Sequence, residues 1–155
     1  MGDVDGDGKL DAVFANNGSF AGNEQHNRVC LGSGTGLFSC TDVSSDNTFT
    51  RGMALGDVDG DGNVDAVFAN EGQRNRVCLG DGTGVFGCAD MNTDTHSTVN
   101  VALGYVDGDG NLDAIFANNG QPNQVCLGDG TGGFICSDIS SDTNGTFRVA
   151  LAPSI

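Results

Sequence analysis

The sequence has 155 residues, the length of one ordinary domain, and its 21 Asp and Glu against 6 Lys and Arg give a formal net charge of −15. Clustered Lys and Arg are needed to bind phosphate groups, so this composition argues against DNA, RNA or an anionic membrane as the partner. No run of 18 apolar residues occurs, which excludes a transmembrane helix and membrane insertion through one. Charged residues make up only 17% of the chain, and apolar residues recur at fixed places, which argues against disorder.

The chain begins with an aspartate-rich segment that recurs twice. "GDVDGDGKLDAVFAN" at residues 2–16 returns as "GDVDGDGNVDAVFAN" at 56–70 and as "GYVDGDGNLDAIFAN" at 104–118. The shared "VDGDG" starts at residues 4, 58 and 106, which gives spacings of 54 and 48 residues. The difference comes from the longer first loop "NGSFAGNEQH". We therefore expect a single repeat domain over 1–155, with units of about 1–55, 56–103 and 104–155.

Each unit contains four short strand patterns. In the second unit they cover 64–70, 75–79, 85–88 and 99–103, with Gly, Asn or Asp at their ends. The intervening "GDGTG" is typical of a tight turn between hairpin strands. Four strands in about 48 residues match one blade of a β-propeller, so we predict an all-β fold of four-stranded blades, three per chain. An ordinary β-sandwich is the alternative, but it gives no reason for near-identical units.

The aspartates follow the pattern D-x-D-x-D-G-x-x-D. Hard carboxylate oxygens at this density favour Ca²⁺, and without a cation they would repel one another. By analogy with other such loops, the backbone carbonyl of the residue at position seven also coordinates. An EF-hand needs Glu at position twelve, where this chain has Phe14, Phe68 and Phe116. Asp-Gly turns without metal are the alternative. The predicted ligands are Asp3, Asp5, Asp7, Lys9 and Asp11 in the first loop, Asp57, Asp59, Asp61, Asn63 and Asp65 in the second, and Asp107, Asp109, Asn111 and Asp113 in the third.

The third loop departs from the pattern because Tyr105 replaces its first aspartate. Calcium affinity follows the number of charged ligands. We therefore expect weaker binding in this loop than in the other two.

These segments, together with "NRVCLGDGTGVF", resemble the FG-GAP/VCBS repeat family over essentially the whole chain. The family forms the calcium-loop blades of integrin-α-like β-propellers, so the resemblance implies that fold, bound calcium and the aspartate ligands named above. Two features differ: such propellers usually have about seven blades in one chain, and paired cysteines are not a general family feature.

Six cysteines form three pairs, each ten residues apart and flanking a "GTG" turn. If the turns are hairpins, the two cysteines of a pair face each other across antiparallel strands, which suits a disulfide. Disulfides imply an oxidising compartment, so we expect a secreted, extracellular protein. Free buried thiols are the alternative, whereas zinc lacks recurring ligands. The expected pairs are Cys30–Cys40, Cys78–Cys88 and Cys126–Cys136.

No catalytic constellation is evident, so we predict a non-enzymatic protein. His26 and His96 have no recurring partners and are expected to be exposed loop residues. We favour a structural or adhesive scaffold with a glycan or protein ligand. The alternative is a lectin, since some fungal members of the family bind N-acetylglucosamine between blades. That alternative is weakened by the lack of Trp and because four Phe at repeated strand positions are expected in the core: Phe14, Phe38, Phe68 and Phe86.

The strand patterns also suggest an assembly. If each blade is counted from the strand that precedes its aspartate loop, three strands are expected in the first blade, then four, then four, and one further strand around Val149–Leu151. Propellers usually have four to eight blades, and two-fold dimers are the commonest assemblies. We therefore expect a homodimer that forms one six-bladed ring, in which each C-terminal strand completes the first blade of the other chain.

Overall fold

The computed structural model describes residues 2–18 and 25–151. Residues 19–24, which hold most of the longer first loop, and residues 152–155, which end the predicted C-terminal segment, lie outside the described part. The described chain is all-β and contains no helix, and therefore none that is long and apolar enough to cross a membrane.

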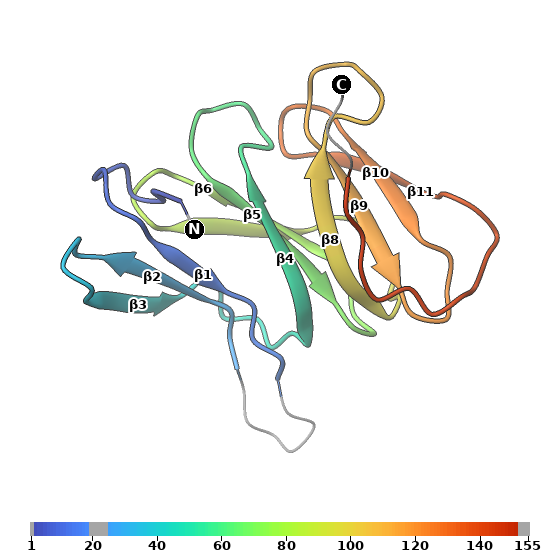
Figure 1. Cartoon of the computed structure of the whole chain (residues 1–155), viewed down its shortest axis with the longest axis horizontal. Helices are drawn as coiled ribbons and strands as arrows, with labels where there is room; N and C mark the ends of the chain where they lie inside the picture. The colour runs from blue at the N-terminus through green and yellow to red at the C-terminus, as the bar shows by residue number, and fades with distance from the viewer. Residues whose placement is uncertain (1, 19–24, 152–155) are drawn as a thin grey trace.

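The strands form three antiparallel sheets in which sequence neighbours pair (Figure 1). The first sheet has three strands: β1 (Ala12–Phe14), β2 (Arg28–Gly32) and β3 (Phe38–Asp42). The second has four: β4 (Thr50–Gly56), β5 (Asp65–Asn70), β6 (Arg76–Gly80) and β7 (Phe86–Asp90). The third also has four: β8 (Thr98–Gly104), β9 (Asp113–Asn118), β10 (Gln124–Gly128) and β11 (Phe134–Asp138).

The predicted strands of the second unit are confirmed to within two residues. The sequence repeat and the sheet are nevertheless offset by one strand. The strand that ends each repeat unit becomes the first strand of the next sheet, because β4 pairs with β5 and β8 pairs with β9. Four-stranded antiparallel sheets in this order have the size and topology of propeller blades.

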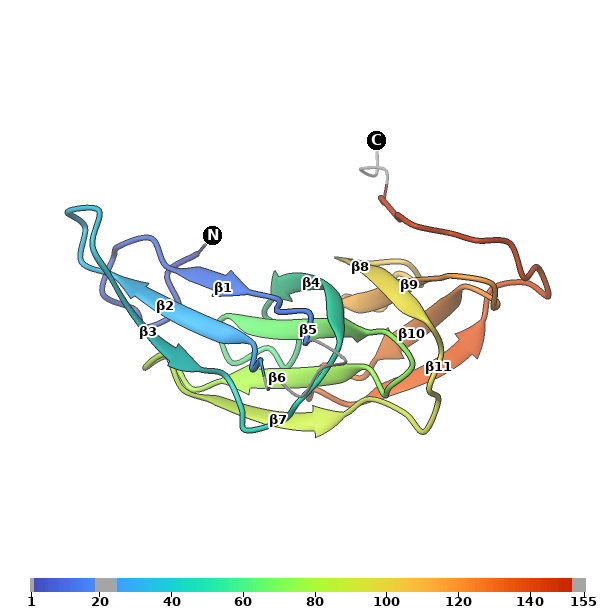
Figure 2. The ribbon, with the colours of Figure 1, turned by 90° about the horizontal axis from the view of Figure 1, so that it is seen from below.

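Neighbouring sheets lie side by side, with β4 against β8 (Figures 1 and 2). The space between them is filled by two apolar clusters. Burial of this apolar surface is what holds one sheet against the next. The cluster between the first and second sheets contains Val4, Val29, Val43, Ala66, Phe68, Cys78 and Phe86. The cluster between the second and third contains Val58, Val67, Ala69, Val77, Met91, Val101, Ala114, Phe116 and Cys126.

Two of the four phenylalanines expected in the core are exposed. Phe68 and Phe86 are buried as predicted, but Phe14 is 50% exposed and Phe38 52%. The reason is tertiary. Each inter-sheet cluster needs a preceding sheet, and β1 has β2 as its only partner strand within the described residues.

Each predicted cysteine pair forms a disulfide that joins two paired strands. Cys30 and Cys40 are direct partners in the β2–β3 register, and the same holds for Cys78 with Cys88 and Cys126 with Cys136. The bridges therefore close the outer hairpin of every sheet and restrict the unfolded chain.

The strand predicted around Val149–Leu151 is not formed within this chain, because residues 146–151 carry no strand. It is held beside the third sheet, where the Thr146 amide donates to the Asn118 carbonyl over 3.2 Å and the Val149 amide donates to Asn100 Oδ1 over 3.1 Å. A strand requires a paired neighbour, and none of the three sheets offers one at this place.

Candidate metal centre

The second and third aspartate loops connect the first and second strands of their sheets, and the first loop precedes β1. The second loop leaves β4 at Gly56 and enters β5 at Asp65, and these two residues are paired in the sheet. Gly62 has a φ of 90°, a conformation that side chains other than Gly adopt only with strain. Because the strand pair fixes both ends, the intervening carboxylates are confined to a small loop.

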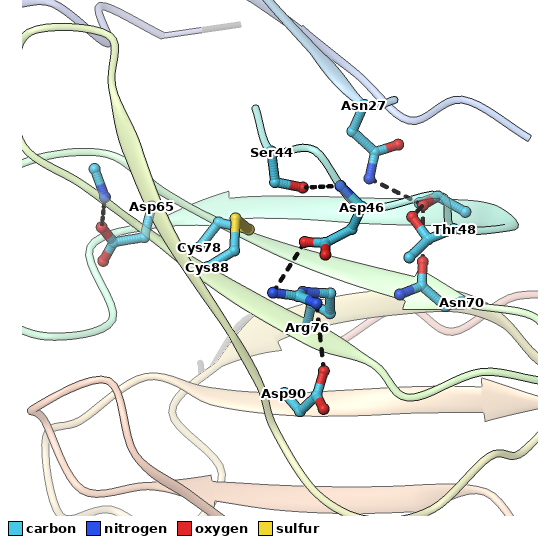
Figure 3. Close-up of a disulfide and its surroundings, with 12 residues drawn as sticks. Asn27, Ser44, Asp46, Thr48, Asp65, Asn70, Arg76, Cys78, Cys88 and Asp90 are labelled. Carbon is cyan, nitrogen blue, oxygen red and sulfur yellow. Dashed lines mark hydrogen bonds and ion pairs between the residues drawn. A yellow bond between two sulfur atoms is a disulfide. The ribbon is translucent and has the colours of Figure 1, made fainter. Parts of the chain in front are cut away.

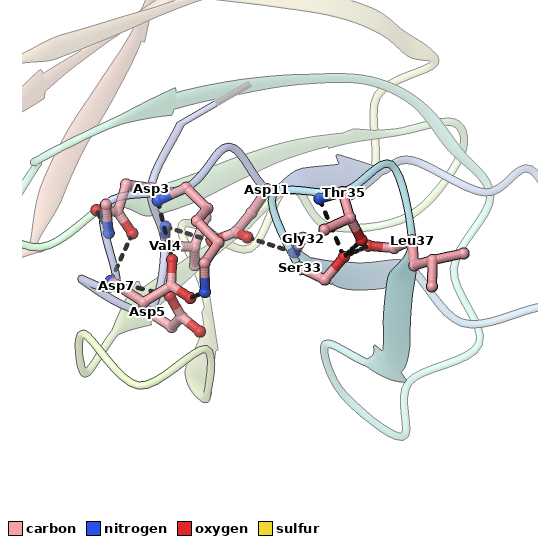
Figure 4. A network of polar contacts seen from close by, with 11 residues as sticks. Asp3, Val4, Asp5, Asp7, Asp11, Gly32, Ser33, Thr35 and Leu37 are labelled. Carbon is pink, nitrogen blue, oxygen red and sulfur yellow. Dashed lines mark hydrogen bonds and ion pairs between the residues drawn. The ribbon is translucent and has the colours of Figure 1, made fainter.

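Carboxylate oxygens converge in two of the three loops. Asp57, Asp59 and Asp61 each offer an oxygen, and these oxygens lie within 4.8 Å of one another. In the first loop, the same holds for Asp3, Asp5 and Asp11 (Figure 4). Hard divalent cations are bound in proteins by carboxylate oxygens gathered in this way.

Backbone amides hold the first carboxylate of the loop in place. Asp57 accepts hydrogen bonds from the amides of Gly60 at 2.8 Å and Gly62 at 3.0 Å. In the first loop, Asp3 accepts bonds from Asp7 at 3.1 Å and Gly8 at 2.8 Å. The turn thus positions the carboxylates before any ligand arrives.

Asp7 differs from its counterpart in the second loop. Its carboxylate forms an ion pair with Lys9, and the hydrogen bond from the Lys9 ammonium holds the pKa of Asp7 below its usual value. The Asp7 carboxylate therefore points to Lys9. The converging group of the first loop contains Asp11 in its stead. Coordination of a cation by any of these residues stays a prediction.

The last aspartate of each loop links two elements of the sheet. The Asp65 side chain is fully buried; Oδ2 accepts a bond from the Val58 amide and Oδ1 one from the Gly80 amide, each at 2.8 Å. Asp11 does the same with Val4 and Gly32, both at 2.7 Å. The predicted ligand is thus also a structural link between the loop and the end of a later strand, which is β6 for Asp65 and β2 for Asp11.

Burial opposes the charge on this carboxyl group. Desolvation raises the pKa of Asp65, and the nearby charges of Asp59 and Asp61 act in the same direction, while the hydrogen bonds from Gly80 and Val58 counter them. A bound cation would relieve this repulsion.

The third loop retains the link but lacks a converging triplet. Asp113 accepts bonds from Val106 at 2.7 Å and Gly128 at 3.0 Å. Tyr105 is exposed and supplies no acceptor to the loop amides in the position of Asp57. Asp109 accepts two bonds from Asn111, which lower its pKa. Among the described residues, no group of three acidic side chains gathers in this loop.

The two histidines are half-buried residues with polar partners, which corrects the expectation of exposed loop positions. His26 Nδ1 lies 3.0 Å from Asp42 Oδ2, and this bond lowers the pKa of Asp42. His96 Nδ1 lies 3.4 Å from Asn118 Nδ2. Both histidines sit in these local contacts, remote from the carboxylate loops in sequence.

Sequence reasoning missed a set of polar links between sheets. Asn27 donates to Thr50 Oγ1 at 2.9 Å, and Thr50 donates to Asn70 at 2.7 Å. Arg76 joins Asp46 of the preceding connector at 3.1 Å to Asp90 of its own sheet at 3.5 Å (Figure 3). The signal available in the sequence was the Asn that recurs two residues before each "VC" and the Thr that begins both β4 and β8.

Comparison with known proteins agrees with these repeats. A family model described as an FG-GAP-like repeat matches residues 3–68 and 57–116. No curated protein matches the chain. The family matches include the two loops with converging carboxylates and the strands that follow them. The chain therefore belongs to the FG-GAP-like repeat family.

Proposed function

We propose that this chain is a non-enzymatic, calcium-binding β-propeller module that assembles with a second copy into a six-bladed ring and acts as an extracellular structural or adhesive scaffold. The observation that carries the proposal is the convergence of three carboxylates in each of two loops at equivalent places in the repeat. The FG-GAP-like repeats support a propeller-like binding module.

Calcium suits these loops better than softer metals. The converging atoms are carboxylate oxygens, and the described loops contain no His or Cys. Ca²⁺ takes six to eight oxygen ligands in flexible geometry, which carboxylates, loop carbonyls and water together can supply. The ion would join the two ends of each loop and neutralise part of a chain with net charge −15.

Other features support a secreted scaffold rather than a lectin. Three disulfides are compatible with an oxidising, extracellular setting. Between the described sheets the space is occupied by the two apolar clusters, which leaves little room there for a sugar. A glycan array with and without chelator distinguishes the two functions, since calcium-dependent glycan binding would favour the lectin.

Isothermal titration of calcium-free protein with Ca²⁺ tests the proposal. We expect two strong sites and one weaker site. Asp59→Asn should remove one strong site, since it deletes a converging carboxylate. Asp142→Asn is the charge-matched control, because Asp142 is an exposed acid outside the loops whose described hydrogen bonds are to Ser140. No heat of binding in the unmodified protein would refute the proposal.

A further inference from the structure

The same interface between sheets occurs twice within the chain. Val4 of the first loop and Val43 pack against Phe68 of the second sheet. Their counterparts Val58 and Met91 pack against Phe116 of the third sheet. We call the surface on the earlier sheet, which carries the Val and Met side chains, the donor side of the interface. The surface on the later sheet, which carries the Phe side chain, is the acceptor side; both names refer to packing and not to hydrogen bonding.

The third sheet carries an unused donor side. Val106 occupies the position of Val58 but is 43% exposed, whereas Val58 is 1% exposed. Ile139, the counterpart of Met91, is also exposed. These residues have the apolar character of the two buried donor sides, yet none of the three sheets in the described residues covers them.

The first sheet carries an unused acceptor side. Phe14 corresponds to the buried Phe68 and Phe116, and Phe38 corresponds to the buried Phe86. Both are half exposed, as is Leu10 beside them. Exposure of several large apolar residues on one face marks an interaction surface.

The unused donor side contains a cavity of about 300 Å³. Its lining includes Ile115, Ala117, Ile139 and Val149. Their counterparts one repeat earlier, Val67, Ala69, Met91 and Val101, form one buried cluster with Phe116. The cavity therefore stands where the preceding interface holds a phenylalanine side chain.

Residues 146–151 are already placed like the first strand of a further sheet. Leu151 packs on Gly104 as Leu103 packs on Gly56. Asn123 donates to Thr146 Oγ1 at 3.0 Å. The same bond joins Asn27 to Thr50 at the start of β4, and Asn75 to Thr98 at the start of β8. Sheet edges that expose unpaired amides and carbonyls favour strand addition.

We propose that the donor side of the third sheet binds the acceptor side of the first sheet in a second copy of this chain, with Phe14 of the second copy in the cavity. In the register of the other two sheets, Met53 pairs with Phe68 and Val101 with Phe116, so Val149 pairs with Phe14. Each copy has one donor and one acceptor side, and two copies close into a ring through two identical interfaces. The inference rests on the self-assembly in the proposed function and names its contact residues.

Light scattering of the full chain in calcium tests the interface. The unmodified protein should have twice the mass of the 15.7 kDa chain. Phe14→Asp, which places a charge in the cavity, should give a monomer. Loss of a buried aromatic anchor at both interfaces raises the dissociation constant by roughly a thousandfold. The matched control is Ile135→Ser, which replaces an exposed apolar residue with the residue found at the equivalent position 39; it should remain a dimer.

A mixing experiment separates a broken interface from a misfolded protein. Phe14→Asp damages only the acceptor side and Ile139→Asp only the donor side, so each variant alone should be a monomer. Mixed together, the intact donor side of the first variant meets the intact acceptor side of the second, and a heterodimer should form through one interface. Native mass spectrometry with one isotope-labelled variant identifies it.

Three results would overturn the inference. The first is an unmodified chain that is monomeric, which is expected if another blade or another protein covers these faces. The second is a dimer that survives Phe14→Asp. The third is a mixture of the two variants that yields no heterodimer. Calcium titration of the same samples separates this from the proposed function, because dimers without bound calcium would overturn the calcium role and leave the interface standing.

Discussion

Replacing Asp65 by Asn tests whether the fourth aspartate of the second loop stabilises the fold independently of calcium. Its side chain is fully buried and bonds the Val58 and Gly80 amides at 2.8 Å each. Asn retains one acceptor oxygen, so one buried amide faces an NH₂ group and loses its partner. A buried unpaired donor costs about 1–3 kcal/mol.

The assay is thermal unfolding in chelator, followed by circular dichroism, which removes any calcium contribution. For a chain of this size, a loss of 2 kcal/mol lowers the Tm by about 4–8 °C. Removal of a buried charge near Asp59 and Asp61 returns part of this loss, so the expected change lies at the lower end. Asp57→Asn is the control, because Asp57 is exposed and its amide partners can bond to water instead.

In calcium, both variants should lose stability, since ligand binding to the native state adds stability by mass action. In chelator, only Asp65→Asn should show a marked loss. Equal Tm values for the two variants in chelator would refute a separate structural role for Asp65.

Two further predictions concern the third loop and the acidic groups. Tyr105→Asp restores the fourth carboxylate and should raise calcium affinity at that loop about tenfold, equivalent to about 1.4 kcal/mol. Because the chain has one Tyr and no Trp, terbium emission sensitised by Tyr105 should report the unmodified loop and vanish in this variant; an unchanged signal would contradict the assignment. In chelated protein, carbon NMR should show Asp65 titrating above 3.8 and Asp81 below it. The raised pKa of Asp65 makes its contribution to stability fall as the pH rises above 3.8, whereas hydrogen bonds led by Thr83 lower the pKa of Asp81, whose contribution is lost as the pH falls below 3.8.

Much of the fold follows from patterns local to one repeat. The strands of the second unit alternate between Gly-bounded turns, and their register brings Cys78 opposite Cys88 without any distant contact. The converging carboxylates of Asp57, Asp59 and Asp61 are likewise a property of one short loop. Such features can be read from sequence because they depend on spacing and turn geometry alone.

Other features depend on partners that no local pattern specifies. Phe14 and Phe68 occupy the same position in identical "DAVFAN" segments, yet only Phe68 is buried, because burial requires a preceding sheet. The second role of Asp65 depends on the Gly80 amide, which the hairpin brings back from fifteen residues away. Lys9 diverts Asp7 from the first cluster through a contact between side chains, which an aspartate motif does not encode.

The one-strand offset between repeat unit and sheet has a consequence for how the molecule opens. The first strand of the second sheet, β4, and that of the third sheet, β8, are each covalently continuous with the sheet before. Thr50, the first residue of β4, is hydrogen-bonded to Asn27, which precedes β2, and to Asn70 of its own sheet. Repeat arrays with separable units can lose their ends one unit at a time. In this chain, opening one sheet also breaks contacts that hold the first strand of the next sheet. Amide exchange in adjacent sheets is therefore coupled, and the array approaches a single cooperative unit.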